Sequence, residues 1–143
     1  MGEVKRLLAV DLGAESGRTV LGLFDGDRLA VEEIRRFPNR PVEVGGTLQW
    51  DVLRLYADVL DGVRAAGPVE SLGVDTWGVD FGLLDRAGHL LGNPVHYRDR
   101  RTAGMPDATF RLVPRKEIYE RTGIQFIPIN TLFQLMALVT SKD

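Results

Sequence analysis

The chain has 143 residues, the size of one ordinary domain, and its 44% hydrophobic and 27% charged residues are close to the average of soluble globular proteins. Eighteen basic and twenty acidic residues give a net charge of -2, which offers no electrostatic surface for nucleic acid or an anionic membrane. The absence of cysteine excludes disulfide frameworks, thiolate metal sites and a cysteine nucleophile, and it fits a cytoplasmic protein.

The first forty residues predict three strands joined by tight turns. Residues 7–10 form a short apolar run, which is typical of a strand buried on both faces. Two further strands are expected over residues 19–24 and 29–37, and the sequence DGDR between them predicts a hairpin turn. The next segment, PVEVGGTLQWD, is typical of a loop or a short hairpin.

The middle of the chain contains the strongest helical pattern. Apolar residues recur at helical spacing over residues 52–63, with Asp51 as the expected N-cap and a stop at Gly67. Strands are then expected over residues 71–76 and 79–84, followed by a turn.

The last forty residues predict three further helices. A weaker pattern covers residues 102–112, and a second helix is expected over 115–121 with Gly123 as its C-cap. The final helix is expected after a cap at Asn130 or Thr131. Strands followed by helices, without internal repeats, indicate an α/β fold with a mixed sheet.

The first candidate site is the segment VDLGAESGR, which runs from a strand into a turn bracketed by glycines. Its spacing matches neither the P-loop nor the dinucleotide-binding fingerprint. Asp11 at the strand end could hold Mg²⁺ through water, while Gly13 and Gly17 let backbone N–H groups converge on an anion and Ser16 and Arg18 add donors. Equally, Asp11 could cap a plain turn in which Gly13 supplies a positive φ.

The second candidate site is the segment GVDTWGVDFGLLD, in which Asp75 and Asp80 interrupt apolar runs on either side of Trp77. Burying a carboxylate costs several kcal/mol unless it is paired or directed at a polar ligand. A tryptophan face with nearby carboxylates suits a sugar, because the ring packs on C–H groups and the acids accept hydroxyl protons. The alternative, which this stretch alone favours, is a hairpin with Trp77 in the core.

Taken in order, the segments DLGAESGR, GVDTWGVDF, YRDRRT and TGIQFIPINT resemble the FGGY carbohydrate kinases, in particular the branch that acts on L-rhamnulose. The resemblance runs from about residue 7 to residue 138. It implies an actin-like ATPase fold of the ribonuclease H-like type, with a mixed sheet and flanking helices. The chain is then expected to be an incomplete N-terminal portion of the first domain, without the rest of that domain or the second, adenosine-binding domain.

The resemblance also implies residue roles. Asp11 matches the acid associated with Mg²⁺. The residues that match the turn around the ATP phosphates are Ala14, Glu15, Ser16, Gly17 and Arg18. The residues that match the sugar pocket are Gly78, Asp75, Trp77, Arg98 and Asp99. Glu15 is expected to point its side chain outward, because an anion beside phosphates repels them. The general base, an aspartate, is expected beyond residue 143, so none of the present residues takes that role.

The activity that the resemblance implies is cytoplasmic, ATP- and Mg²⁺-dependent phosphorylation of the C1 hydroxyl of L-rhamnulose, in L-rhamnose catabolism. The 143-residue chain itself is expected to be inactive and to self-associate through apolar surface that an incomplete domain leaves bare. Its partners are expected to be the sugar and ATP, with no nucleic acid and no membrane. Two alternatives remain open: a kinase for a related ketose or deoxy-sugar, and a non-catalytic actin-like nucleotide-binding module.

Overall fold

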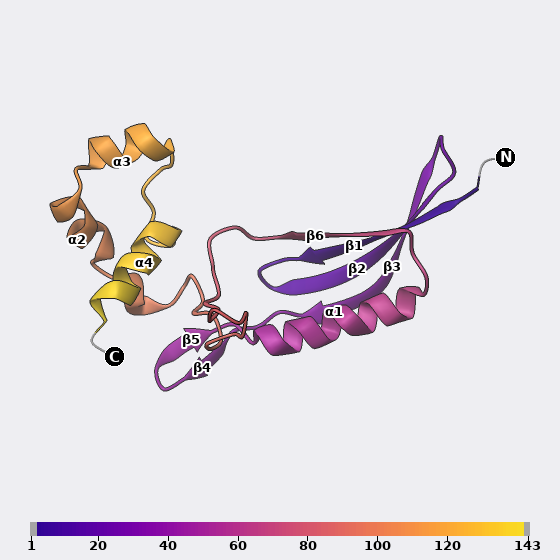
Figure 1. Ribbon diagram of the computed structural model, residues 1–143, viewed down its shortest axis with the longest axis horizontal. Coiled ribbons are helices and arrows are strands. Elements are labelled where there is room, and N and C mark those ends of the chain that lie inside the picture. Colours follow the sequence, from indigo (N-terminus) through magenta and orange to yellow (C-terminus); the bar gives the residue numbers. More distant parts are fainter. Residues whose placement is uncertain (1–2, 142–143) are drawn as a thin grey trace. The chain divides into compact units, whose positions relative to one another are not determined.

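The computed structural model describes residues 3–141, which divide into two units (Figure 1). Within the described residues, the first unit comprises residues 3–41 and 50–78, and the second comprises residues 42–49 and 79–141. Among the described residues, no helix has the length and apolar character needed to cross a bilayer. The elements in chain order are β1 (Lys5–Leu12), β2 (Ser16–Phe24), β3 (Leu29–Pro38), β4 (Val42–Val44), β5 (Thr47–Gln49), α1 (Val52–Ala66), β6 (Ser71–Thr76), the 3-10 helix η1 (Arg100–Thr102), α2 (Met105–Leu112), α3 (Arg115–Thr122) and α4 (Thr131–Thr140).

The first unit is a four-stranded mixed sheet in the order β3-β2-β1-β6, with α1 running along it (Figure 1). β1 pairs antiparallel with β2, and β2 with β3, whereas β1 and β6 are parallel. The carboxyl ends of β1 and β6 therefore lie at the same edge of the sheet. This confirms the predicted mixed sheet with a flanking helix, and the predicted turn at Asp25, whose carboxylate accepts the N–H of Arg28 at 2.8 Å.

Only one face of the sheet is buried within the described residues. Leu8 and Val10 are buried on the α1 side, whereas Ala9 between them is exposed. The prediction of a strand buried on both faces was therefore wrong. The apolar run reflects α1 packing on one side, and the small Ala9 occupies the open face.

Local signals define both ends of α1 as predicted. The Asp51 carboxylate accepts the backbone N–H of Arg54 at 3.1 Å, which satisfies one of the free donors of the first turn. At the other end Gly67 has a φ of 70°. Arg6 of β1 donates to the carbonyl of Ala66 at 2.6 Å, so the sheet also caps the helix C-terminus.

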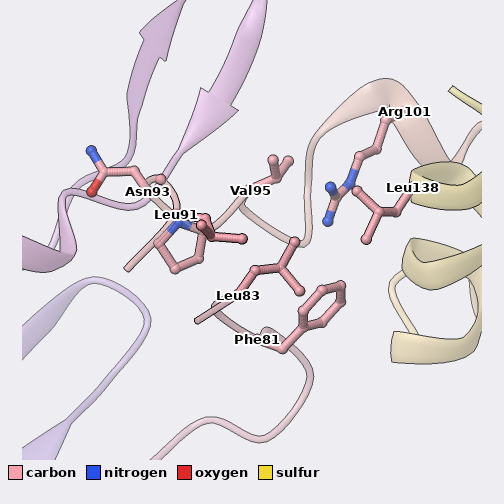
Figure 2. A pocket seen from close by; sticks show the side chains of 9 residues that line it. Phe81, Leu83, Leu91, Asn93, Val95, Arg101 and Leu138 are labelled. Atoms are coloured by element: carbon pink, nitrogen blue, oxygen red, sulfur yellow. The ribbon is translucent and has the colours of Figure 1, made fainter. Parts of the chain in front are cut away.

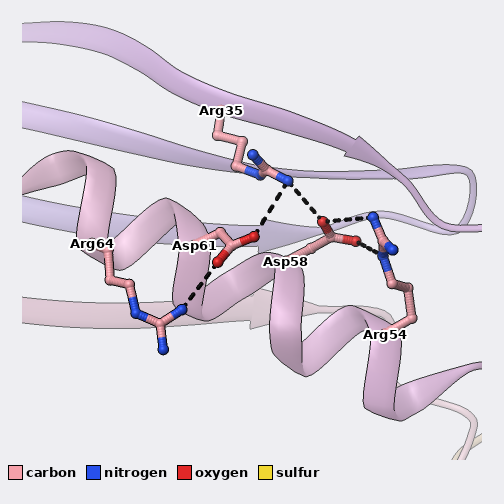
Figure 3. A network of polar contacts seen from close by, with 5 residues as sticks. All are labelled: Arg35, Arg54, Asp58, Asp61 and Arg64. Atoms are coloured by element: carbon pink, nitrogen blue, oxygen red, sulfur yellow. Dashed lines mark hydrogen bonds and ion pairs between the residues drawn. The ribbon is translucent and has the colours of Figure 1, made fainter.

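A buried acid joins α1 to the sheet (Figure 3). The Asp58 side chain is 2% exposed; its Oδ2 accepts from Arg54 Nε at 2.8 Å and its Oδ1 accepts from Arg35 of β3 at 3.0 Å. The hydrogen bond from Arg54, followed by that from Arg35, lowers the pKa of Asp58 against the opposing effect of burial. The ionised carboxylate is thus a structural tie between helix and sheet.

We expect Asp58→Asn to lower the free energy of unfolding by about 2 kcal/mol at neutral pH, because it removes two charge-assisted hydrogen bonds from partly exposed arginines. Because the folded pKa is depressed, this contribution is present above the unfolded value of about 3.9 and is lost as the pH falls through the folded pKa. Denaturant unfolding of both proteins across acidic pH measures this. A difference that does not shrink in acid contradicts it. Asp61→Asn, with a half-exposed side chain, is the matched control.

The parallel edge strand β6 carries exposed apolar side chains. All six of its residues are exposed, and Val74 reaches 60%. Leu72 and Val74 pair in register with the buried Leu8 and Val10 of β1, so they extend the apolar face beyond the area that α1 covers. Such surface is a candidate for contact with another polypeptide segment.

The second unit begins with the β4–β5 hairpin, which confirms the hairpin alternative for PVEVGGTLQWD. Gly45 and Gly46 form its turn, both with positive φ. The predicted strand over residues 79–84 is wrong: within the described chain this segment forms only an isolated bridge between Leu84 and Leu90. An apolar run forms a strand only where a neighbour offers a register, and this one turns back immediately at Asp85.

From Arg100 onward, the second unit consists of helices joined by short loops. The predicted helix over residues 102–112 is split, because Gly104 adopts a φ of 74° between η1 and α2. Gly123 is the C-cap of α3 as predicted, with a φ of 65°. Phe133 of α4 is buried and contacts Phe110 of α2 edge to face, with ring centroids 5.8 Å apart. These aromatic contacts form the helical core.

Candidate functional site

The turn between β1 and β2 is held by a residue that lies far from it in the sequence. Asn39 is buried; its side chain donates to the carbonyl of Gly13 at 2.7 Å and its backbone N–H donates to the carbonyl of Glu15 at 3.0 Å. Gly13 N–H closes the turn on the carbonyl of Ser16 at 3.0 Å. Sequence reasoning missed Asn39, because it saw only a residue between two prolines.

Two backbone donors in this turn are left without acceptors. Within residues 3–141, the N–H groups of Ala14 and Glu15 donate to no protein group, whereas that of Gly13 is used inside the turn. The Glu15 side chain is exposed, as expected. The turn can therefore offer consecutive N–H groups to an anion, which is the property expected of a phosphate-binding nest.

In the structure, Gly13 and Gly17 are needed for packing, and not for converging N–H groups or for a positive φ at Gly13, the two expectations from the sequence. Neither has a positive φ. A Cβ on Gly17 would lie 2.2 Å from a ring carbon of Phe37, and one on Gly13 would lie 2.9 Å from the carbonyl oxygen of Ser16. Close approach therefore requires glycine at both positions, and the left-handed-turn alternative for Gly13 is wrong.

A row of charged side chains crosses the open face of the sheet. Pairing aligns Arg36 of β3 with Arg18 of β2, Arg18 with Asp11 of β1, and Asp11 with Asp75 of β6. The neighbouring Thr19 faces α1, so the alternation of side chains places the row on the opposite face. The sheet thus brings together the predicted metal ligand, one predicted phosphate donor and one predicted sugar residue.

Arg18 and Asp11 form an ion pair, with Arg18 Nε 2.8 Å from Asp11 Oδ2. The Arg18 side chain is 44% exposed and the Asp11 side chain is 38% exposed. Such an exposed pair contributes at most about 1 kcal/mol. It can therefore open at little cost when a cation and a phosphate replace the two partners. The Ser16 hydroxyl lies 3.4 Å from a guanidinium nitrogen of Arg36, which adds a second cation beside the turn.

The residues present fit a magnesium ion that keeps most of its water. Asp11 lies one residue before the end of β1, and Mg²⁺ is commonly held by one or two carboxylates. In the described part of the chain, no cluster of three or more acidic, histidine or cysteine residues could form a full protein cage. When bound, the ion would neutralise phosphate charge at the end of β1.

The segment after β6 carries Trp77 and Gly78. The Trp77 ring lies 4.4 Å from that of the buried Trp50, with an interplanar angle of 36°. This contact fits the core alternative as well as the sugar-stacking one, because Trp77 itself is only half-buried. A Cβ added to Gly78 would meet nothing within 4 Å, so packing does not require glycine there.

In the second unit, the two predicted sugar residues differ in burial. The Asp99 carboxylate is buried and accepts the backbone N–H groups of Leu48 at 2.7 Å and Arg101 at 2.8 Å. Arg98 is exposed, with its guanidinium 5.3 Å from the ring centre of Tyr97. Asp99 therefore supports this loop, and Arg98 is the side chain available to a ligand.

A polar network underlies this loop; sequence reasoning singled out Asp80 but missed the roles of His96, Arg101 and Gln134. His96 is buried, which lowers its pKa against the influence of Asp80, and its Nδ1 accepts the N–H of Arg98 at 2.9 Å. Gln134 of α4 donates to Asp80 Oδ1 at 2.9 Å and accepts from Arg101 at 2.8 Å. An amide within the apolar pattern of a helix was the only signal in the sequence.

Next to this network lies a pocket of about 180 Å³ with mainly apolar walls, which include Phe81, Leu83, Leu91 and Leu138 (Figure 2). Arg101 is the charged residue that lines it. Burial lowers the pKa of Arg101, against the opposing influence of nearby acids. The pocket thus borders the loop that carries Arg98, but none of the predicted site residues lines it.

Comparison with known proteins relates the chain to sugar kinases. A rhamnulokinase from Bacteroides thetaiotaomicron is 48% identical over 143 residues, covering 97% of this chain and 30% of that protein. Rhamnulokinases from Oceanobacillus iheyensis and Pectobacterium atrosepticum are 42% and 45% identical over 94% of this chain, which covers 30% and 28% of them. The chain therefore spans about 30% of the length of these relatives. No protein-family model matches it.

Solved structures show the same fold at low identity. Xylulose kinase from Lactobacillus acidophilus matches with a TM-score of 0.78 at 19% identity, over 96% of this chain and 29% of that one. Gluconate kinase from the same organism matches with a TM-score of 0.77 at 18% identity, over 98% of this chain and 29% of that one. Glycerol kinase from Plasmodium falciparum, solved with ADP, matches with a TM-score of 0.74 at 16% identity, over 99% of this chain and 30% of that one. The fold is that of the actin-like FGGY sugar kinases.

Proposed function

Because the chain is homologous to rhamnulokinases and has the fold of FGGY-type sugar kinases, we propose that it is the N-terminal part of a kinase that transfers the γ-phosphoryl group of Mg-ATP to the C1 hydroxyl of L-rhamnulose. The observation that carries the proposal is the turn after β1. Among residues 3–141, the backbone N–H groups of Ala14 and Glu15 in this turn near Asp11 have no protein acceptor. Charge neutralisation and positioning are what phosphoryl transfer asks of a protein.

The nucleotide phosphates are assigned to the turn. The N–H groups of Ala14 and Glu15 donate to phosphate oxygens, and Ser16 and Arg18 add side-chain donors. Gly17 keeps the backbone against Phe37 and so sets the path of the turn. Asp11 is assigned to the water shell of Mg²⁺, a cofactor that withdraws charge from the phosphates when it is bound.

The sugar is assigned to Asp75, Trp77, Gly78, Arg98 and Asp99. Gly78 offers its backbone, since no atom of the described residues lies within 4 Å of a Cβ added there, and Trp77 offers a ring face. Asp75 accepts hydrogen bonds from sugar hydroxyls, and Arg98 donates hydrogen bonds to the sugar from its exposed loop. Asp99 supports this loop by accepting backbone N–H groups. The general base and the adenosine contacts are assigned to parts of a longer protein outside these 143 residues.

The test of this proposal is a coupled assay of ADP release by the full-length protein with L-rhamnulose, fuculose and xylulose. We expect the highest kcat/KM with L-rhamnulose and no turnover by the 143-residue chain. The short chain is expected to self-associate through the exposed apolar edge at β6 as its concentration rises. A preference for another ketose overturns the substrate, and nucleotide binding without sugar-dependent turnover overturns the kinase.

Gly78→Val in the full-length protein separates a substrate role from a structural one. Among the described residues, a Cβ at this position has no atom within 4 Å and needs no positive φ, so we expect the free energy of unfolding to change by at most about 0.5 kcal/mol. The KM for the sugar is expected to rise at least about tenfold, because the branched side chain fills the space assigned to the sugar. Gly92→Val, where an added Cβ likewise has no described atom within 4 Å, is the control; an unchanged sugar KM in Gly78→Val contradicts the assignment.

A further inference from the structure

Gln134 of α4 is 1% exposed, and its side chain makes four hydrogen bonds within the second unit. Its Nε2 donates to Asp80 Oδ1 at 2.9 Å, to the carbonyl of Ile129 at 3.0 Å and to the carbonyl of Val79 at 3.1 Å. Its Oε1 accepts from Arg101 at 2.8 Å. Both ends of the amide are therefore engaged.

These contacts hold both ends of one short loop. Asp80, fixed by Gln134 through Oδ1, accepts the backbone N–H of Tyr97 through Oδ2 at 3.2 Å. At the other end of the loop, Arg101 donates directly to Gln134. Arg98 lies between these two anchor points with its side chain exposed. The position of Arg98 is therefore set from α4, more than thirty residues away along the chain.

The chemistry of this position requires an amide. One side chain must donate to a carboxylate and to carbonyls while it accepts from a guanidinium, and among the uncharged side chains only an amide combines two N–H donors with an acceptor. Burial already lowers the pKa of Arg101, and its Nε has no hydrogen-bond partner among the described residues. Loss of Oε1 would remove an acceptor from a cation that burial disfavours.

We propose that Gln134 is a positioning residue for sugar binding: it holds both ends of the 97–101 loop and thereby orients the Arg98 guanidinium toward the sugar. The inference rests on the proposed function, since Arg98 is assigned to the sugar there. It adds a residue that touches neither substrate and acts only through Asp80 and Arg101.

The test uses the full-length protein and separates the two substrates. Gln134→Leu is expected to raise the KM for L-rhamnulose about tenfold or more, the loss that follows when one charge-assisted hydrogen bond is misaligned, and to change the KM for ATP by no more than about twofold. Arg98→Ala is expected to raise the sugar KM similarly. The double variant is expected to be no worse than Arg98→Ala alone, because both changes remove the same contact.

Exchange of the hydrogen-bonding partners provides a second variant in case Gln134→Leu fails to fold. Gln134→Glu places two carboxylates together. Adding Asp80→Asn restores a donor–acceptor pair between the two side chains that still accepts from Tyr97 and Arg101, while the carbonyls of Val79 and Ile129 lose their donor, so the recovery is partial. We expect the sugar KM to rise in the single variant and to recover at least about threefold in the double one. Gln125→Glu makes the same chemical change at an exposed position and is expected to have no effect.

The outcomes distinguish the two proposals. An active wild-type protein in which Gln134 substitutions leave the sugar KM unchanged, raise both KM values equally, or add to Arg98→Ala overturns the positioning role alone. A wild-type protein that phosphorylates no sugar overturns the proposed function, and the positioning role falls with it.

Discussion

Asp11→Asn in the full-length protein is expected to lower kcat with L-rhamnulose at least about 100-fold and to raise the Mg²⁺ concentration needed for half the maximal rate. The physical reason is that the amide keeps the shape of the carboxylate but loses the charge that a hydrated cation needs at the end of β1. Initial rates over a range of Mg²⁺ concentrations measure both effects.

The same substitution is expected to change the free energy of unfolding by less than about 1 kcal/mol, because the ion pair that it removes is 38% exposed on the Asp11 side. Asp61→Asn, which also removes surface ion pairs with arginine, is the activity control. If Asp11→Asn retains kcat within about threefold of the wild type, the metal role is wrong and the residue only pairs with Arg18.

Gly62→Ala is expected to destabilise the protein by about 2 kcal/mol, although helix propensity alone predicts a gain of about 1 kcal/mol for the same change. Gly62 lies on the buried face of α1, where a Cβ would stand 2.5 Å from both Oγ1 and Cγ2 of Thr19 and 3.0 Å from its Cβ. Rotation of Thr19 cannot relieve all three contacts, so the helix must move away from the sheet. Denaturant unfolding of the full-length protein shows whether Gly62→Ala lowers or raises the free energy of unfolding.

Thr19→Ala is the relieving partner for Gly62→Ala. It removes the two atoms at 2.5 Å, and it removes a hydroxyl that is buried with no hydrogen-bond partner among the described residues. The double variant is therefore expected to be more stable than the sum of the single changes by about 1 kcal/mol or more. Ala57→Gly on the exposed face of α1 measures the difference in helix propensity between alanine and glycine in this helix. Additive effects in the cycle rule out this close contact as the cause.

The predictable parts of the fold are those that short stretches of chain encode. The cap at Asp51, the turn at Asp25 and the stop at Gly123 each use side chains or φ angles within a few residues, and all three are confirmed. The run over residues 79–84 has the composition of a strand but pairs only at Leu84. Composition does not provide a neighbouring strand, so that prediction failed.

In the helix α1, too, the sequence predicted the local structure but not the tertiary contacts. Its apolar spacing correctly predicted a helix, but Tyr56 of the expected apolar face is exposed, whereas Asp58 and Gly62 are buried. A charged residue and a glycine face the sheet because Arg35 neutralises the first and Thr19 leaves no room at the second. Neither partner is visible from the helical pattern.

By itself the sequence determined most of the helices and strands, the turn after Asp11 and the resemblance to sugar kinases, because these lie in contiguous motifs. The tertiary structure alone decided which groups hold that turn and the Arg98 loop: Asn39 bonds 26 residues away along the chain, and Gln134 bonds 54 residues away. It also decided that packing against Phe37 explains Gly17, and that Asp99 is committed to backbone donors. Such contacts depend on pairing between distant segments, which only the folded chain specifies.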